Sequence, residues 1–214
     1  MVDTRREYDR LAGLYLPIAI GVFVVVVVLV VVFALRWRVR SGAPERAASR
    51  VHSAPRLEAL YVLVLAAVAA FLLTATFRTE AKTDRALGAR GGGPLVAVVA
   101  AKWRWRFTYP GSGIVQQGAT PELVVPAGEP VRFTLISRDV IHSLWIPFLA
   151  FKRAAYPRFV QRFTLTFPAA GYHRAGGECA EYCGLYHDQM RFDVRVLEPA
   201  AFAAWERARG AAAT

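Results

Sequence analysis

Two stretches without a charged residue dominate the first third of the chain and limit how it can fold. Residues 11–35, which include a valine block at 24–28, and residues 59–77 carry no charged side chain. A helix needs about 20 consecutive apolar residues to cross about 30 Å of hydrocarbon. A secretory signal has a shorter apolar core, so we expect the first stretch to be retained. The sequence therefore predicts a membrane anchor over residues 1–78, with transmembrane helices at about 11–35 and 57–77.

The segment between the two apolar stretches is strongly basic. Residues 36–56 hold six arginines and a single acid, Glu45, whereas the N-terminal tail balances three arginines with three acids. Short basic loops stay in the cytoplasm. We therefore expect a multi-pass protein of the bacterial inner membrane, with both termini and the C-terminal domain on the periplasmic side.

The rest of the chain has the pattern of a β-domain. Residues 79–94 are polar and end in Gly-Gly-Gly-Pro, which predicts a flexible linker. From residue 95 to 214, short apolar runs alternate with Pro and Gly, which indicates a Greek-key sandwich or barrel closed by a helix at 199–209. The predicted strands are 95–99, 104–109, 122–125, 131–136, 159–167 and 191–197.

Metal-binding side chains cluster within residues 179–190. Cys179, Cys183, His187 and Met190 offer two thiolates, an imidazole and a thioether. Soft sulfur donors combined with imidazole favour copper over metals that prefer oxygen, and a single blue copper uses one Cys, two His and a weak Met. The additional thiolate points to two copper ions bridged by both sulfurs.

Each copper ion then needs one imidazole and one weaker donor. Met190 supplies one weak donor, and a main-chain carbonyl between the cysteines supplies the other. His142 is the expected second imidazole, because it stands where an apolar strand gives way to a loop. His52 lies between the apolar stretches, and His173 lies in a strand-like run before the cysteines.

Two other interpretations of the cysteines stay open. They are the only cysteines of the chain, so Cys179 and Cys183 would form a disulfide in an oxidising compartment. They would also bind zinc together with two histidines. A disulfide leaves His187 and Met190 unexplained, and zinc has no use for a methionine, so the sequence favours dinuclear copper.

The Cys-x-Glu-x-Cys-x3-His-x2-Met run, the Asp-Val-x-His-Ser run around His142 and the two apolar stretches resemble cytochrome c oxidase subunit II. The resemblance covers nearly the whole chain and implies a cupredoxin-like domain at 95–214 with the dinuclear copper site called CuA. It also implies a magnesium or manganese ion that the Glu181 carboxylate shares with subunit I. The implied copper ligands are His142, Cys179, the main-chain carbonyl of Glu181, Cys183, His187 and Met190.

The resemblance also implies a function. Such a subunit passes electrons from a donor through CuA to haem in subunit I, where oxygen is reduced to water and protons are pumped, and subunit III is a further partner. The chain has no Cys-x2-Cys-His haem motif, so the oxygen chemistry would belong to a partner. Two alternatives remain: the CuA subunit of a nitric oxide reductase, and a stand-alone copper-binding or assembly protein.

Two more residues have roles only by resemblance. Trp103 matches the position where electrons enter the family's copper domain, although Trp103 or Trp105 would equally serve as packing. Glu58 matches a carboxylate at the mouth of a proton path, although Tyr61 replaces the usual Trp and an acid at a membrane boundary needs no such role.

The charge of the C-terminal domain bears on its electron donor. The whole chain has a net charge of +11, and residues 95–214 hold 14 Lys and Arg against 9 Asp and Glu. In a membrane-tethered copper protein this charge does not indicate nucleic acid. Because Arg104 and Arg106 flank Trp103, we expect an acidic, neutral or tethered donor: a cytochrome c, a high-potential iron–sulfur protein or a small copper protein. The alternative is that the few acids, including Asp139, cluster at the docking surface.

Overall fold

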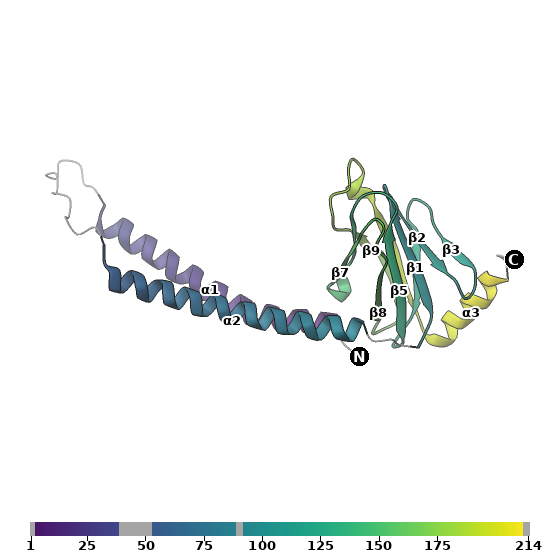
Figure 1. Cartoon of the computed structure of the whole chain (residues 1–214), viewed down its shortest axis with the longest axis horizontal. Helices are drawn as coiled ribbons and strands as arrows, with labels where there is room; N and C mark the ends of the chain where they lie inside the picture. Colours follow the sequence, from purple (N-terminus) through teal and green to yellow (C-terminus); the bar gives the residue numbers. More distant parts are fainter. Residues whose placement is uncertain (1–2, 39–52, 89–91, 212–214) are drawn as a thin grey trace. The chain divides into compact units, whose positions relative to one another are not determined.

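The N-terminal part is a helical hairpin. A computed structural model of the chain describes residues 3–38, 53–88 and 92–211. Helix α1 (Thr4–Arg36) and helix α2 (Pro55–Leu87) are both long and apolar enough to cross a membrane, as the sequence predicted. The two helices lie side by side, and the Tyr15 hydroxyl donates a hydrogen bond to the Leu72 carbonyl at 3.1 Å (Figure 1).

Both helices are longer than the apolar stretches that predicted them. Helix α1 begins before residue 11, and α2 continues to Leu87, so much of the predicted linker 79–94 is helical. A helix does not have to end where its apolar stretch ends, because Ala, Glu, Lys and Arg are good helix formers. Gly88 follows the last turn of α2, and its N–H bonds the Asp84 carbonyl at 2.8 Å. His52 and most of the basic loop lie outside the described residues.

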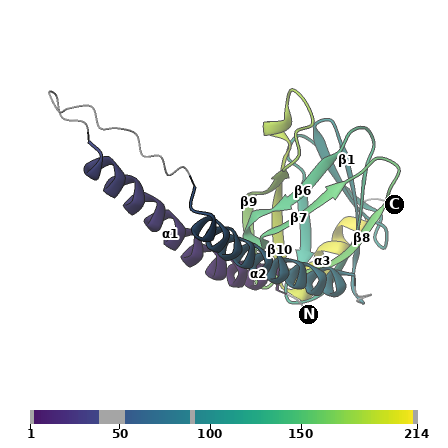
Figure 2. The same cartoon turned by 60° about the vertical axis from the view of Figure 1, so that its left-hand side comes forward.

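The C-terminal part is a sandwich of two five-stranded sheets with orders β3-β2-β1-β5-β8 and β4-β10-β9-β6-β7. The two views place helix α3 (Pro199–Gly210) and the short turn at residues 187–189 at opposite ends of this domain (Figures 1 and 2). The strands are β1 (Leu95–Ala101), β2 (Arg104–Tyr109), β3 (Ile114–Gln116), β4 (Glu122–Pro126), β5 (Pro130–Ser137), β6 (His142–Ile146), β7 (Phe151–Ala155), β8 (Gln161–Thr166), β9 (Gly171–Cys179) and β10 (Arg191–Leu197).

The six predicted strands and the closing helix are all present, and β9 includes the strand-like run around His173, but β3, β6 and β7 were missed. Strand β3 has only three residues and β7 carries two charges, so neither has the apolar run that indicates a strand. The placement of His142 was wrong because β6 was missed. His142 does not lie in a loop after a strand; it begins β6.

Alternating side chains of β2 and β10 build the core at the end of the domain that carries the turn at residues 187–189. Trp105, Phe107 and Tyr109 point inward from β2, while Arg104 and Arg106 are exposed. The Phe192 ring of β10 packs edge-on at 5.8 Å from Trp105 and 5.1 Å from Phe107. Burying each large aromatic side chain contributes about 1.5–3 kcal/mol, so these contacts give the overlying loops a rigid base.

A buried tyrosine hydroxyl joins the two sheets. Tyr109 donates to the Val124 carbonyl at 2.8 Å and accepts from the Val124 N–H at 2.7 Å. Tyr109→Phe leaves both main-chain groups without a partner, so we expect it to lower the free energy of unfolding by about 1–3 kcal/mol. Denaturant titration of the detergent-solubilised chain measures this. Tyr172→Phe is the matched control, because the Tyr172 hydroxyl is exposed and bonds Asp193; equal losses in the two variants would contradict the prediction.

Candidate metal centre

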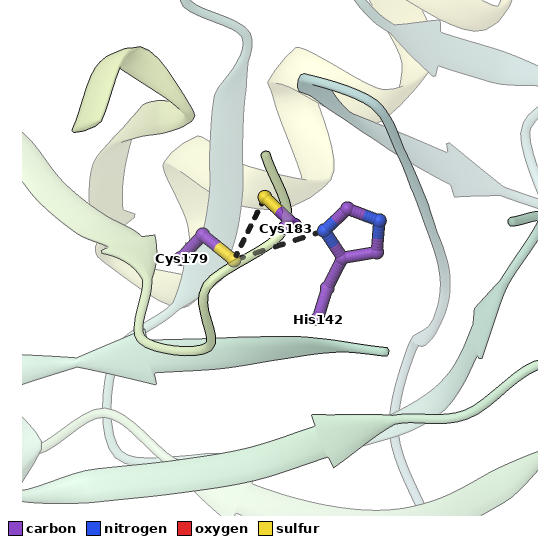
Figure 3. Close-up of side chains that lie close together, drawn as sticks. All are labelled: His142, Cys179 and Cys183. Atoms are coloured by element: carbon purple, nitrogen blue, oxygen red, sulfur yellow. Dashed lines mark hydrogen bonds between the residues drawn. The ribbon is translucent and has the colours of Figure 1, made fainter. Parts of the chain in front are cut away.

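The predicted donor residues come from two segments that strand pairing brings together. Strand β6 pairs antiparallel with the end of β9, with Leu144 opposite Cys179. The Ala180 N–H extends this pairing by bonding the Ser143 carbonyl at 3.0 Å. His142, at the start of β6, therefore faces the cysteine that ends β9 (Figure 3).

The other four predicted donor groups surround the two cysteine sulfurs. The Cys179 Sγ lies 3.7 Å from His142 Nδ1 and 3.9 Å from the Cys183 Sγ (Figure 3). The Cys183 Sγ lies 3.6 Å from His187 Nδ1 and 3.9 Å from the Met190 Sδ. The Cys179 thiol also donates to the Glu181 carbonyl at 3.3 Å. Each sulfur thus has one imidazole and one weaker donor beside it.

Residues 179–190 form a loop whose two ends are joined by a hydrogen bond. The Cys179 N–H bonds the Met190 carbonyl at 3.0 Å, which joins its two ends. Gly184 has φ +115°, a conformation that residues with a side chain rarely adopt. The Trp103 ring lies at van der Waals distance from this glycine, at 3.4 Å from where a Cβ would be. The short 3-10 turn His187–Gln189 then directs His187 and Met190 back toward the sulfurs.

Burial and neighbouring charges give the two thiols different acidities. Burial raises the pKa of Cys179, but hydrogen bonds from His142 and nearby main-chain groups outweigh burial and lower it. Burial raises the pKa of Cys183, and the charge of Cys179 raises it further. Two buried thiolates at this separation repel each other, so a bound cation is required for both to be deprotonated together.

The arrangement fits a pair of bridged metal ions. Thiolate sulfur binds such metals at about 2.3 Å, so two sulfurs sharing one ion lie no more than about 4.6 Å apart. The observed separation of 3.9 Å meets this limit, and both cysteines are free. A tetrahedral zinc ion would leave Met190 unused, although this side chain is fully buried against Cys183. The donor set of thiolate, imidazole and thioether favours copper.

Asp139 has a role that sequence reasoning missed. Its Oδ1 lies 2.8 Å from His142 Nε2, while Oδ2 accepts the Lys102 N–H at 2.7 Å. Burial raises the pKa of Asp139, but hydrogen bonds from Lys102, His142 and Val140 outweigh burial and lower it. An ionised carboxylate on Nε2 fixes the tautomer and leaves Nδ1 to bind metal. The sequence feature that could have indicated this contact is an acid three residues before a candidate ligand histidine.

Both tryptophans of the Lys-Trp-Arg-Trp run contact the metal loop. The half-buried Trp103 donates from Nε1 to the Cys183 carbonyl at 3.2 Å and packs edge-on against Tyr186 at 4.9 Å between ring centroids. Trp105 is fully buried and donates to the Met190 carbonyl at 3.3 Å. Trp103 therefore connects the surface with the loop, whereas Trp105 supports the loop from below.

The other predicted residues lie apart from this cluster. The Glu181 side chain is exposed, and only its carbonyl faces Cys179. His173 stacks on Phe148 with 3.9 Å between ring centroids. In the helical hairpin, the Glu58 carboxylate accepts the Ala54 N–H at 2.8 Å, which caps the start of α2.

Comparisons with known proteins match the β-domain in sequence and in fold. Residues 111–197 match the family model for the periplasmic domain of cytochrome c oxidase subunit II. Cytochrome c oxidase subunit 2 of Thermostichus vulcanus is 40% identical over 125 residues, which cover 56% of this chain and 35% of that protein. The subunit 2 of Bacillus sp. (strain PS3) is 32% identical over 180 residues, or 79% of this chain and 49% of that protein. The chain thus spans between a third and a half of these relatives.

A solved structure supports the fold. The periplasmic domain of subunit II of cytochrome oxidase from Bradyrhizobium japonicum superposes with a TM-score of 0.51 at 23% sequence identity, covering 59% of this chain and 99% of that domain. The two sheets described above therefore form a cupredoxin-like domain, as the sequence predicted.

Proposed function

We propose that this chain is a subunit II of the cytochrome c oxidase family and the electron-accepting subunit of a haem-copper terminal oxidase, because its residues 111–197 match the family model and its relatives carry that name. The observation that carries the proposal is the cluster of four donor groups around two unbonded sulfurs 3.9 Å apart. A stand-alone disulfide or zinc site would not need Met190 buried beside Cys183.

The proposed copper ligands are the donor groups of that cluster. Cys179, Cys183, His142 and His187 would hold the copper, with the carbonyl of Glu181 and the Met190 thioether as weak donors. Dinuclear copper, when bound, supplies a one-electron acceptor in which the added charge is shared between two ions. The chain's own residues exclude water from the cluster, because His142 and Met190 are fully buried. The closed loop limits movement of the ligands between redox states.

Trp103 is the proposed point at which electrons enter the domain. Its half-buried indole reaches from the surface to the Cys183 carbonyl, and no comparable surface contact is made by Trp105, which is fully buried. The physical reason for the proposal is that this accessible indole donates a hydrogen bond directly to the main chain of Cys183, a proposed ligand.

The membrane arrangement and partners complete the proposal. The basic loop would remain in the cytoplasm and hold the cupredoxin-like domain in the periplasm. Electrons would pass to haem in subunit I, with subunit III in the same complex, and oxygen would be reduced to water there. The exposed Glu181 carboxylate is free to share a magnesium or manganese ion with subunit I. Glu58, in the first turn of α2, is the proposed start of a proton path.

Purification of the native complex tests this function. A tagged chain is expected to co-purify with a haem-bearing subunit, and the complex should consume oxygen when supplied with a small-molecule reductant. The same complex carrying Cys183→Ser is the control, in which oxygen consumption should fall to background. Consumption of nitric oxide in place of oxygen would favour a nitric oxide reductase, and purification of the chain alone would favour an assembly protein.

A further inference from the structure

Three arginines line a hollow on the outer face of the sheet that contains β2. The hollow has a volume of about 410 Å³ and is lined by Arg104 and Arg106 of β2 and by Arg138, which follows β5. The alternation along β2 turns Trp105 inward and both arginines outward. The Arg138 N–H bonds the Ala100 carbonyl at 2.9 Å, which places the third arginine alongside β1. The remaining lining residues are Val99, Ala101, Trp105, Gln117 and Gly118.

The positive charge of this arginine hollow is not neutralised within the described part of the chain. No acid lines it, and none of the ion pairs among the described residues includes Arg104, Arg106 or Arg138. Asp139, the acid next in sequence, directs its carboxylate to Lys102 N–H and to His142 instead. The predicted alternative, in which Asp139 contributes to an acidic docking surface, stays a prediction, because this carboxylate lies beside Lys102, the residue before Trp103.

The arginine hollow lies next to the residue proposed to receive electrons. Arg104 directly follows Trp103, whose indole bonds the Cys183 carbonyl. Tyr186 packs edge-on against the Trp103 ring, and Tyr186 and Leu185 are both exposed. The surface around Trp103 therefore combines exposed apolar side chains with three unpaired guanidinium groups.

We propose that the arginine hollow docks the acidic face of a small electron-carrier protein. Guanidinium groups form bidentate hydrogen bonds with carboxylates, and three of them would hold a cluster of Asp and Glu side chains beside Trp103. This inference rests on the proposed function, because the docked carrier would lose one electron to the copper centre and leave oxidised. A lysine-rich carrier would be repelled from the same surface.

The test compares two carriers on the native oxidase complex by stopped-flow spectroscopy across ionic strength. An acidic c-type cytochrome should reduce the complex fastest at low salt and slow steeply as salt rises, because screening weakens charge steering. The triple variant Arg104→Gln, Arg106→Gln, Arg138→Gln should lower its bimolecular rate at low salt about tenfold. The control triple variant Arg162→Gln, Arg174→Gln, Arg209→Gln removes the same charge from exposed positions elsewhere and should change the rate less than about twofold.

A small uncharged reductant separates failure of docking from failure of the proposed function. It needs no docking site and should reduce the copper centre equally in all three complexes. If it does not reduce the unmodified complex, both the function and the docking site are wrong. If it does, but the two triple variants react alike with the acidic cytochrome, docking at the arginine hollow is overturned. Faster reduction by a lysine-rich cytochrome at low salt, slowing as salt rises, would overturn it as well.

Discussion

Replacing either cysteine with serine is expected to abolish the dinuclear copper signal of the full-length chain. In Cys179→Ser or Cys183→Ser, one of the two bridging sulfurs is lost, and a hydroxyl is a poor substitute because it does not ionise at neutral pH. The remaining donors can hold at most one copper ion, so copper content should fall from two ions per chain to one or none. Metal analysis and electron paramagnetic resonance measure both quantities on the same sample.

Met190→Leu provides the matched comparison for the cysteine variants. It removes a donor from the same buried cluster, but the thioether is a weak ligand and leucine fills a similar volume. This variant should retain the shared-electron signal and show a changed reduction potential. A cysteine variant that keeps two copper ions and the shared signal would contradict the bridging role of the sulfurs.

The second large effect is expected from Asp139→Asn. The asparagine keeps the shape and can still accept the Lys102 N–H, but it removes the negative charge beside His142 Nε2. Loss of a carboxylate that orients a ligand histidine commonly weakens metal affinity about 10–100-fold. Competition with a copper chelator measures the affinity, and the absorption and resonance spectra report on the His142 environment.

Asp193→Asn is the control for this variant. Asp193 lies on β10 of the same domain and accepts hydrogen bonds from the Tyr172 hydroxyl and the Ala175 N–H, so the substitution makes the same chemical change away from the cluster. Its copper affinity and spectra should match those of the unmodified chain. If Asp139→Asn behaves like this control, the carboxylate does not position His142.

The strong periodic signals of the sequence were reliable for the fold. Uncharged stretches predicted both long helices, and apolar runs predicted strands β1, β2, β4, β5, β8 and β10. Strand β7 was missed and β9 was recognised only as a strand-like run around His173, because their own side chains carry little signal: β7 includes Lys152 and Arg153, and β9 has consecutive glycines. Pairing partners decide such strands, and pairing cannot be read from local composition.

The metal cluster was predictable because its donors are chemically distinctive and mostly close in sequence. The structure places His142 beside Cys179 and stacks His173 on Phe148, so the ligand role of His142 stays a prediction that its position supports. The direction of Asp139 was not predictable, because a carboxylate three residues from a histidine can face solvent equally well. The arginine hollow was also hidden, since Arg138 joins Arg104 and Arg106 only through the parallel pairing of β1 with β5.

The most direct measurement is the copper content and paramagnetic resonance spectrum of the unmodified full-length chain. The dinuclear account predicts two copper ions per chain and a hyperfine pattern from one unpaired electron shared between two copper nuclei. One copper ion per chain, or a hyperfine pattern from a single copper nucleus, would contradict it.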